Sequence, residues 1–194
     1  MQSTGMERIV REPGTPAACI SLIGMAGAGK STVGRQLARL LGWELVDTDH
    51  LIEACYGVRL QAISEKLGKE AFLDAEESVI LSLRAHRVVL ATGGSVIYRQ
   101  EAMRHLQALG PLVWLEVPLA LVLERVARNP QRGLAIGPGQ SVEDLFHERQ
   151  ALYKLYADYT LQPGERDPEA CAREVLNNLA PEVAGTGDKG HKGS

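Results

Sequence analysis

The sequence has few of the features that mark disulfide scaffolds, metal cages, membrane proteins or nucleic-acid-binding proteins. It contains three cysteines, an odd number without metal-ligand spacing, which favours a reducing, cytoplasmic setting. No apolar run approaches the ~20 residues of a membrane span, and the N-terminal segment lacks the apolar core of a signal peptide. The net charge of −3 gives no reason to expect a nucleic acid or an anionic membrane as partner. We therefore expect a cytoplasmic monomer that acts on a small molecule.

Length and composition predict one globular domain. With 194 residues, of which 45% are hydrophobic, the chain can bury a full core. Residues 1–17 are polar and contain two prolines, so we expect a flexible N-terminal arm. The domain is expected to span residues 18–180, and the tail at 181–194, rich in Gly and Lys, is expected to be disordered.

The strongest motif is the run GMAGAGKST at residues 24–32, which fits the phosphate-binding loop G-x-x-x-x-G-K-[ST]. Its glycines let backbone N–H groups approach phosphate oxygens. Lys30 can reach the β- and γ-phosphates, and the Ser31 hydroxyl can ligate Mg²⁺. An apolar run precedes the loop and a helical pattern follows it, which is the context that the motif requires. The alternative is a Gly-rich turn that binds nothing. The loop residues predicted to bind nucleotide are Gly27, Ala28, Gly29, Lys30, Ser31 and Thr32.

Apolar runs and helical patterns alternate along the rest of the chain. We expect strands at residues 18–23, 43–47, 87–91, 111–117 and 159–161. Helices are expected between them, with Gly68 separating two of them and Ser141 capping another. This alternation predicts an α/β domain with a parallel sheet, in which ligands bind at the carboxyl ends of the strands. Because the phosphate loop and the segments after two other strands all lie at such ends, we expect them to converge on one site.

Two carboxylates, Asp47 and Asp49, follow the second expected strand at a spacing of two residues. One carboxylate near Mg²⁺ and one near an incoming hydroxyl would suit phosphoryl transfer. The alternative is that one of them only caps the following helix. Beside a phosphate loop, we favour the functional interpretation.

Glycines and arginines farther along supply further candidates. Gly93 and Gly94 either offer backbone N–H groups to a ligand or form a tight strand-to-helix turn. Residues 129–140 are rich in Gly and Pro, a composition typical of an active-site lid. From this lid Arg132 could either close on the phosphates or face solvent. Arg149 lies on an expected helix among acidic neighbours, where a surface ion pair is the simpler interpretation.

Taken together, these motifs resemble the shikimate kinase family. The resemblance rests on GMAGAGKSTVGR at 24–35, VDTD at 46–49 followed by Ile52 and Glu53, LATGG at 90–94, and RQALY at 149–153. It covers about residues 18–180. It implies a P-loop NTPase fold of the nucleoside-monophosphate-kinase-like type: three layers, a five-stranded parallel sheet in the order 2-3-1-4-5, helices on both faces, and a lid. It also implies ATP and Mg²⁺ as cofactors.

The resemblance implies roles for individual residues. Ser31 and Asp47 would serve the metal. Asp49 would contact the acceptor hydroxyls and act as base, with Lys30 and the lid arginine Arg132 as further catalytic residues. The acceptor would be bound by Asp49, Gly93, Gly94 and Arg149, the last at its carboxylate. The positions that border adenine are Arg128, Arg166 and Pro168.

Three positions depart from the family pattern. Leu73 stands where the family has a second arginine for the shikimate carboxylate, Ser95 replaces the third glycine of a triplet, and Gly133 replaces the proline after the lid arginine. Leucine cannot make the charged hydrogen bond of an arginine, and loss of such a bond costs ~1.5–3 kcal/mol. The acceptor side of the site therefore departs from the family pattern. Lys69 and Arg99 are the two basic residues that could substitute for the missing arginine.

These departures leave three interpretations of function. We prefer homoserine as acceptor, with Arg149 at its carboxylate and Glu76 or Asp74 at its ammonium. The first alternative is shikimate itself, so both readings are of a kinase in amino-acid biosynthesis. The second is a non-catalytic ligand-sensing domain, against which the phosphate-loop lysine and both aspartates are retained.

Overall fold

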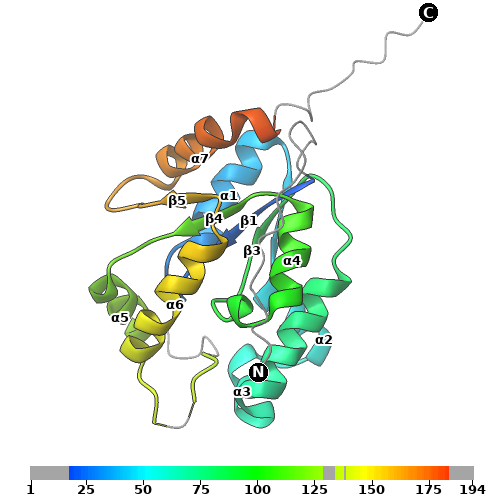
Figure 1. The fold of residues 1–194 in the computed structure, drawn as a ribbon, viewed down its shortest axis with the longest axis vertical. Helices are drawn as coiled ribbons and strands as arrows, with labels where there is room; N and C mark the ends of the chain where they lie inside the picture. The colour runs from blue at the N-terminus through cyan, green and yellow to red at the C-terminus, as the bar shows by residue number, and fades with distance from the viewer. Residues whose placement is uncertain (1–17, 129–133, 138, 184–194) are drawn as a thin grey trace, which may run out of the picture.

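The computed structural model describes residues 18–128, 134–137 and 139–183, and strands and helices alternate along them (Figure 1). In chain order the elements are β1 (Cys19–Ile23), α1 (Lys30–Leu41), β2 (Glu44–Asp47), α2 (Thr48–Tyr56), α3 (Leu60–Ser82), β3 (Val88–Ala91), the 3-10 turn η1 (Val96–Tyr98), α4 (Gln100–Leu109), β4 (Leu112–Leu115), α5 (Leu119–Arg128), α6 (Val142–Tyr156), β5 (Tyr159–Leu161) and α7 (Pro168–Val183). Each of the five expected strands is present.

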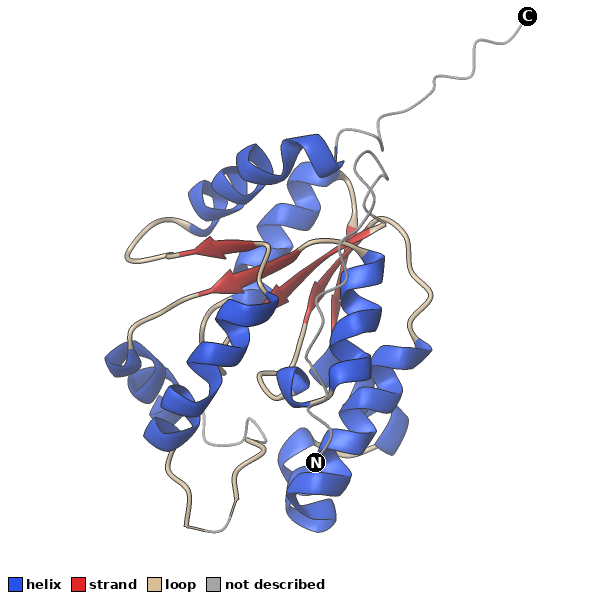
Figure 2. Cartoon of the chain, viewed as in Figure 1, coloured by secondary structure: helices blue, strands red, loops and turns tan. Residues whose placement is uncertain are grey.

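The five strands form one parallel sheet in the order β2-β3-β1-β4-β5, which confirms the implied topology. β1, β3 and β4 are buried along their whole length, as expected for apolar strands covered on both faces. Helices lie on both faces of the sheet (Figure 2). α1 and α7 cover one face and α4 and α6 the other (Figure 1).

The register of the strands brings the predicted site segments to one level. Leu22 of β1 and Asp47 of β2 both pair with Ala91 of β3, so the three strands end side by side. Gly93 then donates its backbone N–H to the Thr48 hydroxyl across 3.1 Å. The phosphate loop, the two aspartates and the two glycines therefore leave the same edge of the sheet, as predicted.

A second, smaller apolar cluster lies away from the main core. It consists of Ile52, Leu60, Ile63, Phe72, Leu73 and Ala135, from α2, α3 and the segment before α6. α3 covers both helices expected around Gly68, whose φ of 74° and ψ of 173° interrupt the helix there. α3 therefore bends where the glycine was expected to separate two helices.

At the C-terminus, α7 continues to Val183, into the stretch that we expected to be a disordered tail. Among the described residues, no helix is long and apolar enough to cross a membrane.

Candidate active site

A cavity of about 720 Å³ opens at the carboxyl ends of the strands. Its lining unites the predicted site residues Gly27, Ala28, Gly29, Lys30, Ser31, Thr32, Asp47, Asp49, Gly93, Gly94, Arg128, Arg149, Arg166 and Pro168. Arg132 lies outside the described residues, so its predicted lid role stays a prediction. The convergence expected from the alternating pattern is thus confirmed.

The phosphate loop is held in shape by the chain around it. Gly29, the N-cap of α1, has a φ of 99°, which only glycine adopts without strain. Lys30 is 9% exposed, and its Nζ donates to the carbonyl oxygens of Gly24 and Met25 at 2.7 and 2.8 Å. The loop also receives a hydrogen bond from Arg125, whose Nη1 donates to the carbonyl of Gly27 at 2.7 Å. The sequence analysis missed Arg125, which precedes Arg128 by one helical turn in α5.

Asp47 caps α2 and also contacts Ser31, the other residue predicted to serve the metal. Its Oδ1 accepts a hydrogen bond from the backbone N–H of Asp49 at 3.1 Å and so caps α2. Its Oδ2 accepts from the Ser31 hydroxyl at 2.6 Å. The hydroxyl and carboxylate oxygens therefore lie together beside the phosphate loop, and they are the hard ligands that Mg²⁺ takes.

The side chains of Asp49, in α2, and Glu76, in α3, both approach Gly93. A Cβ at residue 93 would lie 2.0 Å from Glu76 Oε1 and 2.8 Å from Asp49 Oδ1. A side chain at residue 93 would force these carboxylates to move. The backbone of the turn after β3 therefore lies directly against the proposed catalytic carboxylate.

Glu76 is a buried carboxyl group, 1% exposed, rather than a rim residue. Its Oε2 accepts from the Ser95 hydroxyl at 2.7 Å, and its Oε1 has no hydrogen-bond partner among the described residues. Burial, followed by the nearby Asp49 carboxylate, raises the pKa of Glu76 to about 7. Ser95, one of the three departures, thus provides the hydrogen bond that this buried carboxyl needs.

Arg149 is 1% exposed, so the surface ion pair that we considered simpler is wrong. Its Nε donates to the Tyr98 hydroxyl at 3.1 Å and its Nη2 to the Ala135 carbonyl at 3.3 Å. The guanidinium also lies 5.1 Å from the centroid of the Tyr98 ring. One turn along α6, the Tyr153 hydroxyl donates to the Gly94 carbonyl at 2.6 Å, which ties this helix to the glycine turn.

The two cations expected to replace the missing arginine do not line the cavity. Lys69 Nζ lies 5.2 Å from the Tyr98 ring centroid, and Arg99 pairs with the carboxylates of Glu70 and Asp74. Asp74 is therefore engaged at the surface and is not directed at an acceptor. Besides Arg149, the cavity lining contains Arg59, which was not predicted from the sequence.

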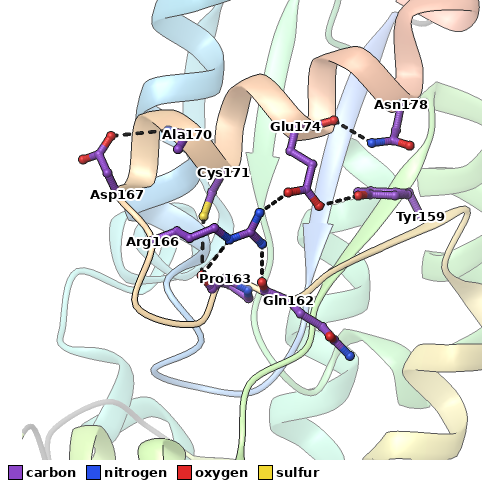
Figure 3. A network of polar contacts seen from close by, with 9 residues as sticks. All are labelled: Tyr159, Gln162, Pro163, Arg166, Asp167, Ala170, Cys171, Glu174 and Asn178. Atoms are coloured by element: carbon purple, nitrogen blue, oxygen red, sulfur yellow. Dashed lines mark hydrogen bonds and ion pairs between the residues drawn. The ribbon is translucent and has the colours of Figure 1, made fainter.

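Arg166 is fixed at the other end of the cavity, in the loop between β5 and α7 (Figure 3). Its guanidinium pairs with Glu174 and donates to the carbonyl oxygens of Gln162 and Pro163. Tyr159 donates to the same Glu174 carboxylate at 2.6 Å. These contacts hold the planar guanidinium beside the cavity, at the position expected to border adenine.

Comparisons with known proteins agree on one family. The family model described as shikimate kinase matches residues 26–180. A shikimate kinase from Methylococcus capsulatus is 39% identical over 86% of this chain and 94% of its own, and a shikimate kinase 1 from Pectobacterium atrosepticum is 38% identical over 82% and 95%. The structure of a shikimate kinase from Acinetobacter baumannii in complex with shikimate covers 84% of this chain and 93% of its own, with a TM-score of 0.78 and 37% identity.

The matched region, residues 26–180, includes all the residues that line the cavity. The retained Lys30, Asp47 and Asp49 do not favour the ligand-sensing alternative. The chain belongs to the shikimate kinase family and is an ATP-dependent small-molecule kinase.

Proposed function

We propose that this protein transfers the γ-phosphoryl group of ATP, bound with Mg²⁺, to a hydroxyl of shikimate. The observation that carries the choice of acceptor is Arg149. Its guanidinium is buried, and its hydrogen bonds among the described residues go to the neutral oxygens of Tyr98 and Ala135. A buried charge of this kind is costly without a full counter-charge. The nearby Glu76 carboxyl, whose pKa is raised to about 7, supplies only part of one, and the carboxylate of the acceptor would supply the rest.

The nucleotide side of the cavity supports ATP as donor. The backbone N–H groups of the loop, the N-terminus of α1 and the ammonium of Lys30 all offer positive charge to phosphate oxygens. Arg125 would keep the loop in shape while these groups bind. Stabilisation of negative charge on the transferring group is the main protein contribution to such reactions.

The oxygens of Ser31 and Asp47 fit Mg²⁺. Among the described residues there is no group of three His, Cys, Asp or Glu side chains that could hold a metal ion. Mg²⁺ commonly binds through one or two protein oxygens together with substrate phosphates, and does not need such a cage. In that position the ion would neutralise charge on the phosphates.

Asp49 is the proposed general base. It lies against Gly93 at the acceptor end of the cavity, where its carboxylate would accept the proton of the attacking hydroxyl. The proton would leave as the oxygen–phosphorus bond forms and ADP departs. Positioned bases of this kind contribute about 10²–10⁴-fold to rate.

Homoserine, our preferred acceptor from sequence, loses its basis. Of the carboxylates proposed for its ammonium, Glu76 is buried against Ser95 and Asp74 pairs with Arg99 outside the cavity. The curated relatives reported above are named shikimate kinases. Shikimate requires only the cationic and hydroxyl-binding groups that line the cavity.

The test is a coupled ADP-release assay with ATP and Mg²⁺, in which shikimate and L-homoserine are compared side by side. We expect kcat/KM for shikimate to exceed that for L-homoserine by at least about 100-fold, because neither carboxylate considered for the homoserine ammonium lines the cavity. Efficient turnover of L-homoserine with shikimate inert would refute the proposed acceptor and leave the kinase chemistry standing.

A further inference from the structure

The acceptor end of the cavity has one buried cation, Arg149, and Leu73 stands where the family resemblance implies a second arginine. The Leu73 side chain is 2% exposed and packs in the second apolar cluster. It contributes no charge to the acceptor. Because the proposed acceptor is an anion, a second cation in the lining would strengthen its binding.

Most cations of the described lining are committed to the nucleotide side. Lys30 and Arg125 bind carbonyl oxygens of the phosphate loop. Arg128 pairs with Glu124 in α5, and Arg166 pairs with Glu174. Of the lysines and arginines that line the described part of the cavity, this leaves Arg59 beside Arg149.

Arg59 lies on the acceptor side because of how α3 packs. The next residue, Leu60, belongs to the apolar cluster that also contains Ala135. The carbonyl of Ala135 in turn accepts a hydrogen bond from Arg149. The apolar cluster therefore joins the start of α3 to the segment whose carbonyl binds the buried guanidinium.

The Arg59 side chain does not itself cap the helix that it precedes. The residue is the N-cap of α3 and makes no side-chain cap hydrogen bond. Ser, Thr, Asp and Asn are the favoured N-caps, and a cation at a helix N-terminus opposes the helix dipole. The cap comes instead from Glu53, whose Oε1 accepts from the backbone N–H of Leu60 at 2.9 Å.

The same Glu53 anchors the arginine. Its Oε2 lies 3.3 Å from Arg59 Nη1, and both residues line the cavity. The Arg59 side chain is 81% exposed. One carboxylate therefore caps the helix and tethers a guanidinium at the mouth of the cavity, where an incoming anion can reach it.

We infer that Arg59 is a specificity-determining residue: tethered by Glu53, its guanidinium binds the carboxylate of the acceptor together with Arg149. The inference rests on the proposed function. Arg149 supplies the buried, permanent charge, and Arg59 supplies a solvent-facing one that is screened by salt.

The test uses Arg59→Ser, with Lys69→Ala as the rival cation and Arg104→Ala as a control at a surface arginine paired with Glu101. In Arg59→Ser we expect KM for shikimate to rise about tenfold to a hundredfold at low salt. We expect kcat and KM for ATP to change by less than about twofold. Because serine is a better N-cap than arginine, the melting temperature should stay equal or rise.

Two further measurements distinguish a charge contact made by Arg59 from a structural role. The rise in KM should shrink as ionic strength increases, because the Arg59 contact is exposed. With shikimate methyl ester, which lacks the carboxylate charge, Arg59→Ser and the wild type should have similar KM values. Lys69→Ala and Arg104→Ala should behave as the wild type does with both acceptors.

The outcomes distinguish the two proposals. Normal shikimate turnover with an unchanged KM in Arg59→Ser overturns the role of Arg59 alone, as does a raised KM in Lys69→Ala instead. An equal loss with the methyl ester shows that Arg59 does not act through the carboxylate, and also overturns the inference. Absence of shikimate turnover in the wild type overturns the proposed function, and the role of Arg59 with it.

Discussion

At the scale of single residues, Arg149 and Glu76 show two ways of burying an ionisable group. Arginine keeps its charge at any pH at which the protein is folded, so Arg149 depends on Tyr98, Ala135 and a ligand to stabilise that charge. A carboxyl group can become neutral instead, and Glu76 is held by the Ser95 hydroxyl with a pKa raised to about 7. We therefore propose that the permanent charge of Arg149 serves ligand binding, whereas the Glu76 carboxyl, which can become neutral, serves the fold.

The raised pKa of Glu76 has a consequence for stability. The ordinary value is 4.5 and the folded value is about 7, so between these pH values the folded state binds more protons than the unfolded state. Stability is therefore lost as pH rises from about 4.5 to about 7, by at most about 3 kcal/mol.

Glu76→Gln removes this ionisation while keeping an oxygen for Ser95. In urea titrations across pH 4.5–8, we expect the variant to gain stability relative to the wild type as pH rises, and the difference to level off above pH 7. Parallel stability profiles for the two proteins would contradict the burial of an ionisable carboxyl at this position.

Asp49 offers a second prediction at this scale. Asp49→Asn should lower kcat by about 10²–10⁴-fold, because the amide cannot accept the proton of the acceptor hydroxyl. The Kd for ATP should change little. Asp74→Asn is the matched control, since Asp74 pairs with Arg99 outside the cavity. If ATP binding collapses while acceptor kinetics are unaffected, Asp49 acts on the metal side instead.

The sequence predicted those site residues whose chemistry follows from a local motif. Lys30, Ser31, Asp47 and Asp49 were found because the spacing of a loop or a strand end fixes their direction. Arg59 was missed because an exposed arginine after a turn is typical of a solvated surface. Only the packing of α3 against α2 brings it to the cavity.

At the scale of elements, apolar runs predicted the strands well because each run is short, buried and bounded by polar or turn residues. The bend of α3 was also predictable, since Gly68 adopts a positive φ that other residues avoid. The sequence did not predict which face α3 turns toward the cavity, because the bend at Gly68 changes the direction of the helix. For this reason Lys69 and Asp74 were considered as residues that contact the acceptor.

The N-terminus of α6 gives a prediction at this scale. The Ser141 side chain accepts from the Asp144 backbone N–H at 3.0 Å, and Asp144 accepts from the Ser141 backbone N–H at 2.8 Å, which confirms the predicted capping box. Ser141→Ala should lower the free energy of unfolding by about 1 kcal/mol, or the melting temperature by roughly 2–4 °C.

Ser82→Ala is the control for that change, because the Ser82 hydroxyl bonds the Val79 carbonyl within α3 and caps nothing. α6 also carries Arg149, so a frayed first turn is expected to raise KM for the acceptor slightly more than KM for ATP. Equal thermal stability of both variants would show that the capping box contributes nothing measurable.

At the scale of the whole molecule, the parallel sheet determines where chemistry can occur. Because β1, β2 and β3 end at one level, three separate segments meet in one cavity, and sequence order alone predicted this. The division of the cavity was harder to predict. Its nucleotide half is built from one motif and its neighbours, whereas its acceptor half collects side chains from α2, α3 and α6 that are far apart in sequence.

The central claim is that this cavity transfers a phosphoryl group from ATP to shikimate. The most direct measurement is phosphorus NMR of a reaction with ATP, Mg²⁺ and shikimate, run beside Lys30→Ala and beside L-homoserine. We expect a phosphate monoester of shikimate in an amount equal to the ADP formed. We expect no ester from Lys30→Ala, whose fold is checked by circular dichroism, because that variant lacks the ammonium placed for the β- and γ-phosphates. ADP without the ester, an ester of homoserine alone, or undiminished ester formation by Lys30→Ala would contradict the central claim.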